Sequence, residues 1–329
     1  MFRRSLLPLL ITAAIVVAAV NAGIAVWSHR LPYALKLESI RTAHDPNILF
    51  LGNSLLDHHL DEAAFAQAAE ARGQALKPLN AALAAVEPPE QRLLFNYATG
   101  GHPGIRTLVV GMYDFQLTRP DQTRLSDLFG NRMVGVDRRF AFGEVAELYG
   151  FGAVDRMEFG VLRALPMAAH RANVWKNVEL LRRAMAEIGM PHAAVNTMGR
   201  VDDFALLEAR SPEAFDALAK AFLDQPDRFS SSYEFIFGEA RRAGMDVAIV
   251  LMPMSPAHQR VFYSRPMWGR YLAALNDLAH ARGIRVIDES GMFADEDDFA
   301  DRLHMTQKSA HLFSVRLGGE LTQPPNPQP

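Results

Sequence analysis

The chain has 329 residues, 49% of them hydrophobic, so it can bury a sizeable core in one large domain with an insertion. Its formal net charge of −3 provides no overall basic field, and nucleic acid is therefore not an expected partner. The lack of cysteine excludes disulfides, thiolate zinc sites and cysteine nucleophiles, but it leaves the compartment open.

The first predicted element is an apolar segment at the amino terminus. Residues 6–27 contain no charge and follow Arg3 and Arg4. This uncharged segment is long enough for a helix that spans a membrane. A cleaved signal peptide is the alternative, because residues 20–22 offer small side chains to a signal peptidase. The apolar run continues beyond that point, which favours an uncleaved anchor, and we predict one transmembrane helix within residues 1–30.

Five short apolar runs follow, and helical patterns separate them. Such alternation predicts an α/β fold in which a parallel sheet is covered on both faces and ligands bind at the carboxyl ends of the strands. The predicted strands are residues 47–51, 75–79, 107–111, 247–252 and 284–287.

Capping residues indicate where several helices begin and end. Serine and threonine hydroxyls can accept from the first backbone N–H groups of a helix, whereas glycine suits the left-handed turn that ends one. We expect helices from near Ser54 or Asp61 to Gly73, from Ser211 and Pro212 onward, and from near Thr306 to Gly318.

Between about residues 120 and 227, mostly helical material interrupts this rhythm, and we interpret it as an insertion over the sheet. The insertion lies within a main domain of residues 31–322, and residues 323–329 form a disordered tail by composition. One helix of the insertion has an apolar face that would contact acyl chains or the bilayer, or pack on its own domain as most such helices do. That face consists of Val174, Val178, Leu181, Met185 and Ile188.

A serine follows the first predicted strand directly. In the sequence ILFLGNSL, Ser54 lies where the chain must turn from the strand into a helix, and Gly52 lets the backbone pass close to that turn. Backbone N–H groups at a helix amino terminus can stabilise an oxyanion, so Ser54 is a candidate nucleophile. A serine that merely caps the helix is the plain alternative.

A nucleophilic serine requires a base, normally an imidazole held by a carboxylate. Asp301 and His304 lie three residues apart after the last predicted strand, so one tight turn can present both at the carboxyl edge of the sheet. Asp301 could instead belong to the solvated acidic stretch that begins at Asp295. The joint occurrence of both motifs favours a triad of Ser54, His304 and Asp301.

The motifs GNSL and DxxH resemble the first and last blocks of the SGNH/GDSL hydrolase family, in register over residues 47–317. The resemblance implies that Ser54 is the nucleophile, that His304 takes its proton and that Asp301 orients the imidazole. It also implies a flavodoxin-like three-layer sandwich with a mostly parallel five-stranded sheet, and it requires no cofactor and no metal.

The intermediate blocks match the family less well. Residues 108–114, LVVGMYD, resemble a block that normally reads glycine-any-asparagine-aspartate, but tyrosine stands at the asparagine position. Alanine follows Asn80 where the family has a glycine donor. The resemblance implies an oxyanion hole made by the Ser54 N–H, Asn80 and Gly111, and substrate contacts, or simple loop packing, by Tyr113 and Asp114.

Within the family, an amino-terminal anchor with a GNS block is most similar to proteins that O-acylate bacterial envelope polymers. Examples are the alginate O-acetylation proteins and the D-alanine-transfer protein of teichoic acid synthesis. The resemblance implies a single-pass protein of the bacterial inner membrane with a periplasmic catalytic domain. Its substrate would be an acyl-bearing small molecule or polysaccharide, and its partner a membrane-bound O-acyltransferase. The alternative is a non-catalytic envelope scaffold.

A second histidine cluster invites a metal-site hypothesis. Asp57, His58 and His59 are adjacent, but neighbouring histidines point in different directions and no second cluster has ligand spacing. We therefore expect a surface or pocket-rim position for these residues. His311 is expected to be structural, because the last helix begins after His304.

Overall fold

The computed structural model describes residues 3–121, 134–171, 174 and 211–323. The chain divides into two compact units, which are described separately. The first, called the α1 unit, comprises Met1–Glu38 and Thr123–Ala193, and the second, called the sheet unit, comprises Ser39–Gln122 and Ala194–Pro329.

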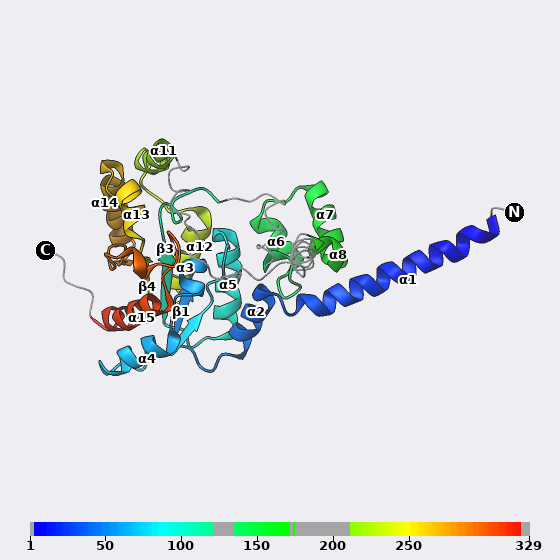
Figure 1. The fold of residues 1–329 in the computed structure, drawn as a ribbon, viewed down its shortest axis with the longest axis horizontal. Helices are drawn as coiled ribbons and strands as arrows, with labels where there is room; N and C mark the ends of the chain where they lie inside the picture. The colour runs from blue at the N-terminus through cyan, green and yellow to red at the C-terminus, as the bar shows by residue number, and fades with distance from the viewer. Residues whose placement is uncertain (1–2, 122–133, 172–173, 175–210, 324–329) are drawn as a thin grey trace, which may run out of the picture. The chain divides into compact units, whose positions relative to one another are not determined.

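A five-stranded parallel sheet forms the centre of the sheet unit (Figure 1). Its order is β2-β1-β3-β4-β5, the flavodoxin-like order, so the predicted α/β fold is confirmed. The strands are nearly continuous apolar runs because both faces of the sheet are covered. They span Ile48–Leu51 (β1), Pro78–Asn80 (β2), Thr107–Met112 (β3), Asp246–Leu251 (β4) and Arg285–Asp288 (β5).

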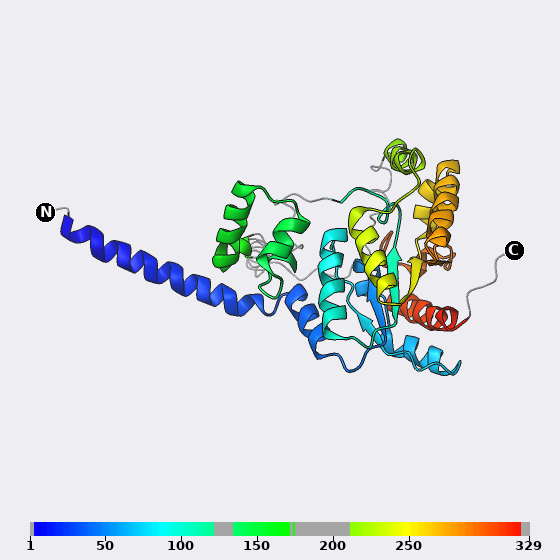
Figure 2. The same ribbon diagram turned by 180° about the vertical axis from the view of Figure 1, so that it is seen from behind.

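Helices cover both faces of this sheet (Figures 1 and 2). On one face α4 (Glu62–Glu70) packs against α15 (Gln307–Leu321), and the buried rings of Phe50, Phe65 and Phe313 belong to the same apolar cluster. On the other face α5 (Pro88–Gly101) contacts α12 (Ser231–Arg242), where the Tyr233 hydroxyl donates to Gln91 Oε1 at 2.9 Å. Further elements are α3 (Ser54–Asp57), α11 (Pro212–Leu223), α13 (Pro256–His258), η3 (Gln259–Tyr263), α14 (Pro266–Ala281) and η4 (Glu296–Asp298).

The capping residues behave largely as predicted. Ser211 Oγ accepts from the Ala214 N–H at 3.3 Å, and Thr306 Oγ1 accepts from the Ser309 N–H at the same distance. The first predicted helix is divided into α3 and α4, because Asp61 caps a new helix after α3 has ended.

The α1 unit is helical in its described residues. The segment Leu7–Ser28 of α1 has a mean hydropathy of 2.5 and is long and apolar enough to cross a membrane. The predicted apolar face of residues 174–188 lies outside the described residues, apart from Val174. The elements are α1 (Arg3–Ser28), α2 (Pro32–Thr42), which continues into the sheet unit, η2 (Val134–Val136), α6 (Phe142–Leu148), α7 (Ala153–Ala164) and α8 (Pro166–Ala169).

The packing of α4 on α15 depends on Gly318, where a Cβ would lie 2.5 Å from the backbone oxygen of Phe65. We expect Gly318→Ala to lower the free energy of unfolding by about 1–3 kcal/mol, because that oxygen cannot swing away. Gly319→Ala is the matched control, since the three atoms nearest to its Cβ would all belong to the flexible guanidinium of Arg72. Both variants gain the same helix propensity, so the difference between their free energies of unfolding, measured with denaturant, reports the steric effect. Equal free energies of unfolding would contradict the predicted clash at position 318.

Candidate active site

The turn after β1 places Ser54 at the start of α3. Asn53 caps this helix, and its Oδ1 accepts from the Leu55 N–H at 3.0 Å. Before it, a Cβ at Gly52 would lie 3.1 Å from the Gly111 oxygen, so a side chain there would push the turn away from β3. The Ser54 N–H thus belongs to the first turn of a helix, whose N–H groups have no intrahelical acceptor.

His304 reaches Ser54 from the opposite end of the chain. Although β3 and β4 separate β5 from β1 in the sheet, the segment after β5 returns across the carboxyl edge and continues into α15, which packs on α4. The turn itself is held by an antiparallel bridge between Phe299 and Met305 and by a bond from the Ala300 N–H to the His304 oxygen at 2.7 Å.

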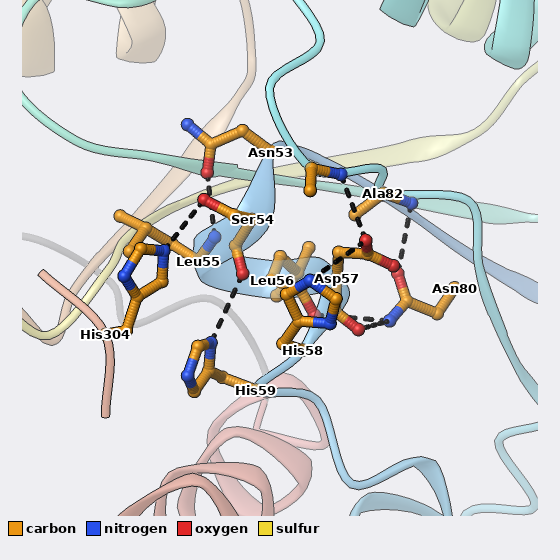
Figure 3. A network of polar contacts seen from close by, with 11 residues as sticks. Asn53, Ser54, Leu55, Leu56, Asp57, His58, His59, Asn80, Ala82 and His304 are labelled. Carbon is orange, nitrogen blue, oxygen red and sulfur yellow. Dashed lines mark hydrogen bonds and ion pairs between the residues drawn. The ribbon is translucent and has the colours of Figure 1, made fainter. Parts of the chain in front are cut away.

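The three predicted triad residues form a continuous hydrogen-bonded line. Ser54 Oγ lies 2.9 Å from His304 Nε2, and His304 Nδ1 lies 2.8 Å from Asp301 Oδ2. The second oxygen of Asp301 accepts from the backbone N–H groups of Leu303 and His304, each at 2.8 Å. Figure 3 shows the His304 ring directed at Ser54.

The charge of Asp301 determines which nitrogen of His304 carries the proton. Burial raises the pKa of this carboxyl, but hydrogen bonds from the His304 side chain and from two backbone N–H groups outweigh it and lower the pKa to about 2. An ionised carboxylate can only accept, so His304 donates through Nδ1 and presents the Nε2 lone pair to the Ser54 hydroxyl. This is the arrangement that general-base activation of a serine requires.

The chain matches no model of a known protein family and no curated protein. The resemblance to SGNH/GDSL hydrolases therefore stays a prediction from the two motifs.

The predicted oxyanion-hole residues have other contacts. The Asn80 amide nitrogen donates to the Leu56 and Asp57 oxygens at 3.2 and 3.4 Å, and its Oδ1 accepts from the Ala82 N–H at 3.0 Å. In Figure 3 Asn80 lies beside Asp57, on the side of α3 away from His304. An oxyanion role for Asn80 stays a prediction. It requires the amide nitrogen to give up a bond to the Leu56 or Asp57 oxygen and to donate to the oxyanion instead.

Gly111 lies within β3, opposite Val250 of β4. A Cβ at this position would lie 3.2 Å from both Leu56 Cδ2 and Met252 Sδ, so the glycine lets α3 pack against the sheet. Its role as an oxyanion donor likewise stays a prediction.

The proposed substrate-contact residues follow β3. Asp114 has a left-handed backbone with a φ of 48°, and its Oδ1 accepts from the Tyr263 hydroxyl at 3.0 Å and contacts His258 Nε2 at 2.9 Å. Tyr113 is partly buried against the apolar cluster of the sheet unit. These contacts hold the loop in place, and substrate binding by either residue stays a prediction.

The histidine cluster after Ser54 does not form a metal site. The Asp57 carboxylate accepts from the Ala84 N–H at 3.0 Å, and His58 is largely exposed. The described residues include no group of three or more His, Cys, Asp or Glu side chains that could hold a metal ion.

Of the two expected positions, surface and pocket rim, the surface position is wrong for His59, which is buried, and the pocket-rim position stays a prediction. The His59 ring stacks on that of His304 with centroids 5.5 Å apart, and its Nδ1 donates to the Ser54 oxygen at 3.2 Å (Figure 3). His59 thus contacts both the backbone of Ser54 and the ring of His304. As expected, His311 has a structural contact, because its Nδ1 lies 2.9 Å from Asp61, the cap of α4.

Protonation of His59 should destabilise the fold. Burial, and then the charge that His304 can carry, lower the pKa of His59 below its ordinary value of 6.5. As the pH falls through 6.5, the unfolded chain therefore takes up a proton that the folded protein resists, and stability is lost. We expect the unfolding temperature of the wild type to fall more between about pH 7.5 and about pH 5 than that of His59→Phe, which keeps a flat ring without a titrating group. Identical pH dependences would contradict this assignment.

Proposed function

We propose that the protein is a serine-dependent esterase or O-acyltransferase of the SGNH/GDSL type. The observation that carries this proposal is the line from Ser54 Oγ through both nitrogens of His304 to Asp301, with distances of 2.9 and 2.8 Å. The nucleophile lies at a helix amino terminus, where backbone N–H groups favour developing negative charge.

In the first half-reaction, Ser54 Oγ attacks the carbonyl carbon of an acyl ester while His304 Nε2 takes the hydroxyl proton. The resulting oxyanion is stabilised by the Ser54 N–H and by the further donors of the hole. His304 then gives its proton to the leaving oxygen, the bond from the carbonyl carbon to that oxygen breaks, and an acyl-serine forms.

In the second half-reaction, an acceptor hydroxyl attacks the acyl-serine and loses its proton to His304 Nε2. The bond between the acyl carbon and Ser54 Oγ breaks, and the serine recovers the proton. Water as acceptor gives hydrolysis, whereas a sugar hydroxyl gives transfer. Asp301 stays ionised and stabilises the imidazolium at each stage.

Covalent labelling tests the proposed nucleophile. We expect a fluorophosphonate to form an adduct on the peptide that contains Ser54, because only an activated serine displaces fluoride at a useful rate. Peptide mass spectrometry locates the adduct. Ser54→Ala should give no adduct, and Ser264→Ala, which removes an exposed hydroxyl outside the triad, should label like the wild type. A label that persists in Ser54→Ala would refute the assignment.

We further propose that α1 is an uncleaved anchor in a bacterial inner membrane and that the sheet unit lies on the periplasmic side. A helix with an apolar segment of the length of Leu7–Ser28 supports the anchor. An acyl-bearing small molecule or an envelope polysaccharide would be the substrate, and a membrane-bound O-acyltransferase would be the partner that supplies acyl groups.

A non-catalytic scaffold is the second candidate, and the engaged amide of Asn80 is the observation that favours it. Turnover of an aryl acetate separates the two functions. Wild-type turnover no faster than that of both Ser54→Ala and His304→Ala would favour the scaffold.

A further inference from the structure

Helix α7 of the α1 unit exposes an apolar stripe, which the exposed side chain of Glu158 borders. Its members recur at spacings of three and four residues and therefore share one face of the helix. The buried side chains of Phe159 and Leu162 lie on a different face of the helix. The exposed members on the helix, with exposed fractions of 71, 69 and 50%, are Val154, Met157 and Val161, and Leu165, the C-cap of α7, is 42% exposed.

The helix that follows this stripe in the chain packs on α1. That helix is α8 (Figure 1), and its Met167 N–H donates to Asn21 Oδ1 at 3.0 Å. Asn21 lies seven residues before the end of the apolar segment Leu7–Ser28. At the rise of an α-helix this is about 10 Å inside the end of that segment. The start of α8 is therefore at the depth of the apolar part of α1.

The polar groups at this junction suit a medium without water. Pro166 has no N–H, the Met167 N–H is taken by Asn21, and the Asn21 amide donates to the Val17 oxygen at 2.9 Å. Backbone donors in hydrocarbon must find partners within the protein, and the Met167 N–H has one in Asn21.

Two aromatic residues lie beside the end of α8, one near the end of α1 and one in α2. Trp27 and Tyr33 both contact the His170 ring, each with centroids 6.3 Å apart, at the end of α8. Tryptophan and tyrosine prefer the boundary between acyl chains and headgroups. Helix α8 and its C-cap thus reach from the level of Asn21 to that of Trp27 along α1.

We propose that α7 and α8 form a second membrane element, which lies in the outer leaflet beside α1 and buries the stripe and Met167 among the acyl chains. This inference rests on the proposed role of α1 as an anchor. The occupant is lipid because lipid surrounds α1 at the depth where Met167 contacts it. An interfacial helix typically inserts about 5–10 Å, which agrees with the depth of Asn21. The α1 unit is then attached to the leaflet at two places.

Single cysteines can test this insertion, because the chain contains none. Full-length Met157→Cys is labelled with an environment-sensitive fluorophore and reconstituted in vesicles of phosphatidylcholine and phosphatidylglycerol. Arg156→Cys is the matched control, since it is exposed on the same helix but outside the stripe. Val16→Cys, exposed within the apolar segment of α1, reports the anchor. Spin-labelled lipids quench labels among acyl chains, and iodide quenches labels in water.

We expect the labels at Met157 and Val16 to emit at shorter wavelength and to lose fluorescence to the lipid quencher, and the label at Arg156 to respond to iodide. Lipid quenching at Val16 with iodide quenching at Met157 would overturn the inference and leave the anchor intact. A Met157 label shielded from both quenchers would overturn it in favour of a covering protein. A Val16 label outside the bilayer would overturn the anchor and the inference together, whereas fluorophosphonate labelling of Ser54 would still decide the proposed chemistry.

Discussion

Replacement of Ser54 by alanine should lower the turnover of an aryl acetate by about 10⁴–10⁶-fold, the scale on which loss of a triad nucleophile acts. In the proposed reaction Oγ is the atom that forms the acyl bond, and no other hydroxyl is expected to take its place beside His304 Nε2. The fold should be unaffected, since Asn53 and not Ser54 caps α3. Steady-state rates and thermal unfolding of the purified protein measure the two effects.

The control for this prediction is Ser314→Ala, which removes a buried hydroxyl from α15. Ser314 Oγ accepts from the Asp61 N–H at 2.8 Å, so its loss should reduce stability but leave the rate per folded molecule unchanged. Aryl acetate turnover that survives in Ser54→Ala at more than about a tenth of the wild-type rate would show that another group performs the chemistry.

The sheet could be predicted from the sequence, and so could the two motifs that supply Ser54 and His304 to the site. A strand buried on both faces is a continuous apolar run, so β1, β3 and β4 stand out against amphipathic helices. The observed strand limits differ from the predicted ones by at most three residues at either end. GNSL and DxxH follow strands of a parallel sheet, and the carboxyl ends of such strands share one edge. That rule alone places Ser54 and His304 in the same region.

The details of the site depend on contacts that local patterns do not encode. His58 and His59 are adjacent and chemically identical, yet only His59 is buried, because the end of α3 turns it toward His304. The direction of the Asn80 amide likewise depends on where α3 ends relative to β2. In both cases the deciding partner belongs to another element, whose position only the folded chain defines.

Two residues near the site were missed although a signal exists for one of them. His258 follows β4 by seven residues, after the capping Ser255, so the strand-end rule that selected Asp114 should have selected it too. Gln116 accepts from the Asn53 amide at 3.2 Å and so supports the cap of α3. A lone glutamine two residues beyond Asp114 carries no pattern that predicts this contact.

Asp301→Asn should lower aryl acetate turnover by about 10⁴-fold while the fold stays intact. The asparagine oxygen can still accept from the Leu303 and His304 N–H groups that Asp301 Oδ1 now binds. The amide nitrogen, however, would donate to His304 Nδ1. The proton would then reside on Nε2, which could no longer accept from Ser54.

Asp295→Asn is the matched control from the same acidic stretch. Asp295 Oδ1 accepts from the Asp297 N–H at 2.9 Å at the start of η4, a bond that asparagine can keep, so the rate should not change. Since the pKa of Asp301 is about 2, the wild type keeps this carboxylate ionised throughout the mildly acidic range. A loss of less than about tenfold in Asp301→Asn would therefore show that the imidazole does not need this carboxylate to hold its proton on Nδ1. The catalytic unit would then reduce to Ser54 and His304, and the resemblance to a triad hydrolase would lose its third member.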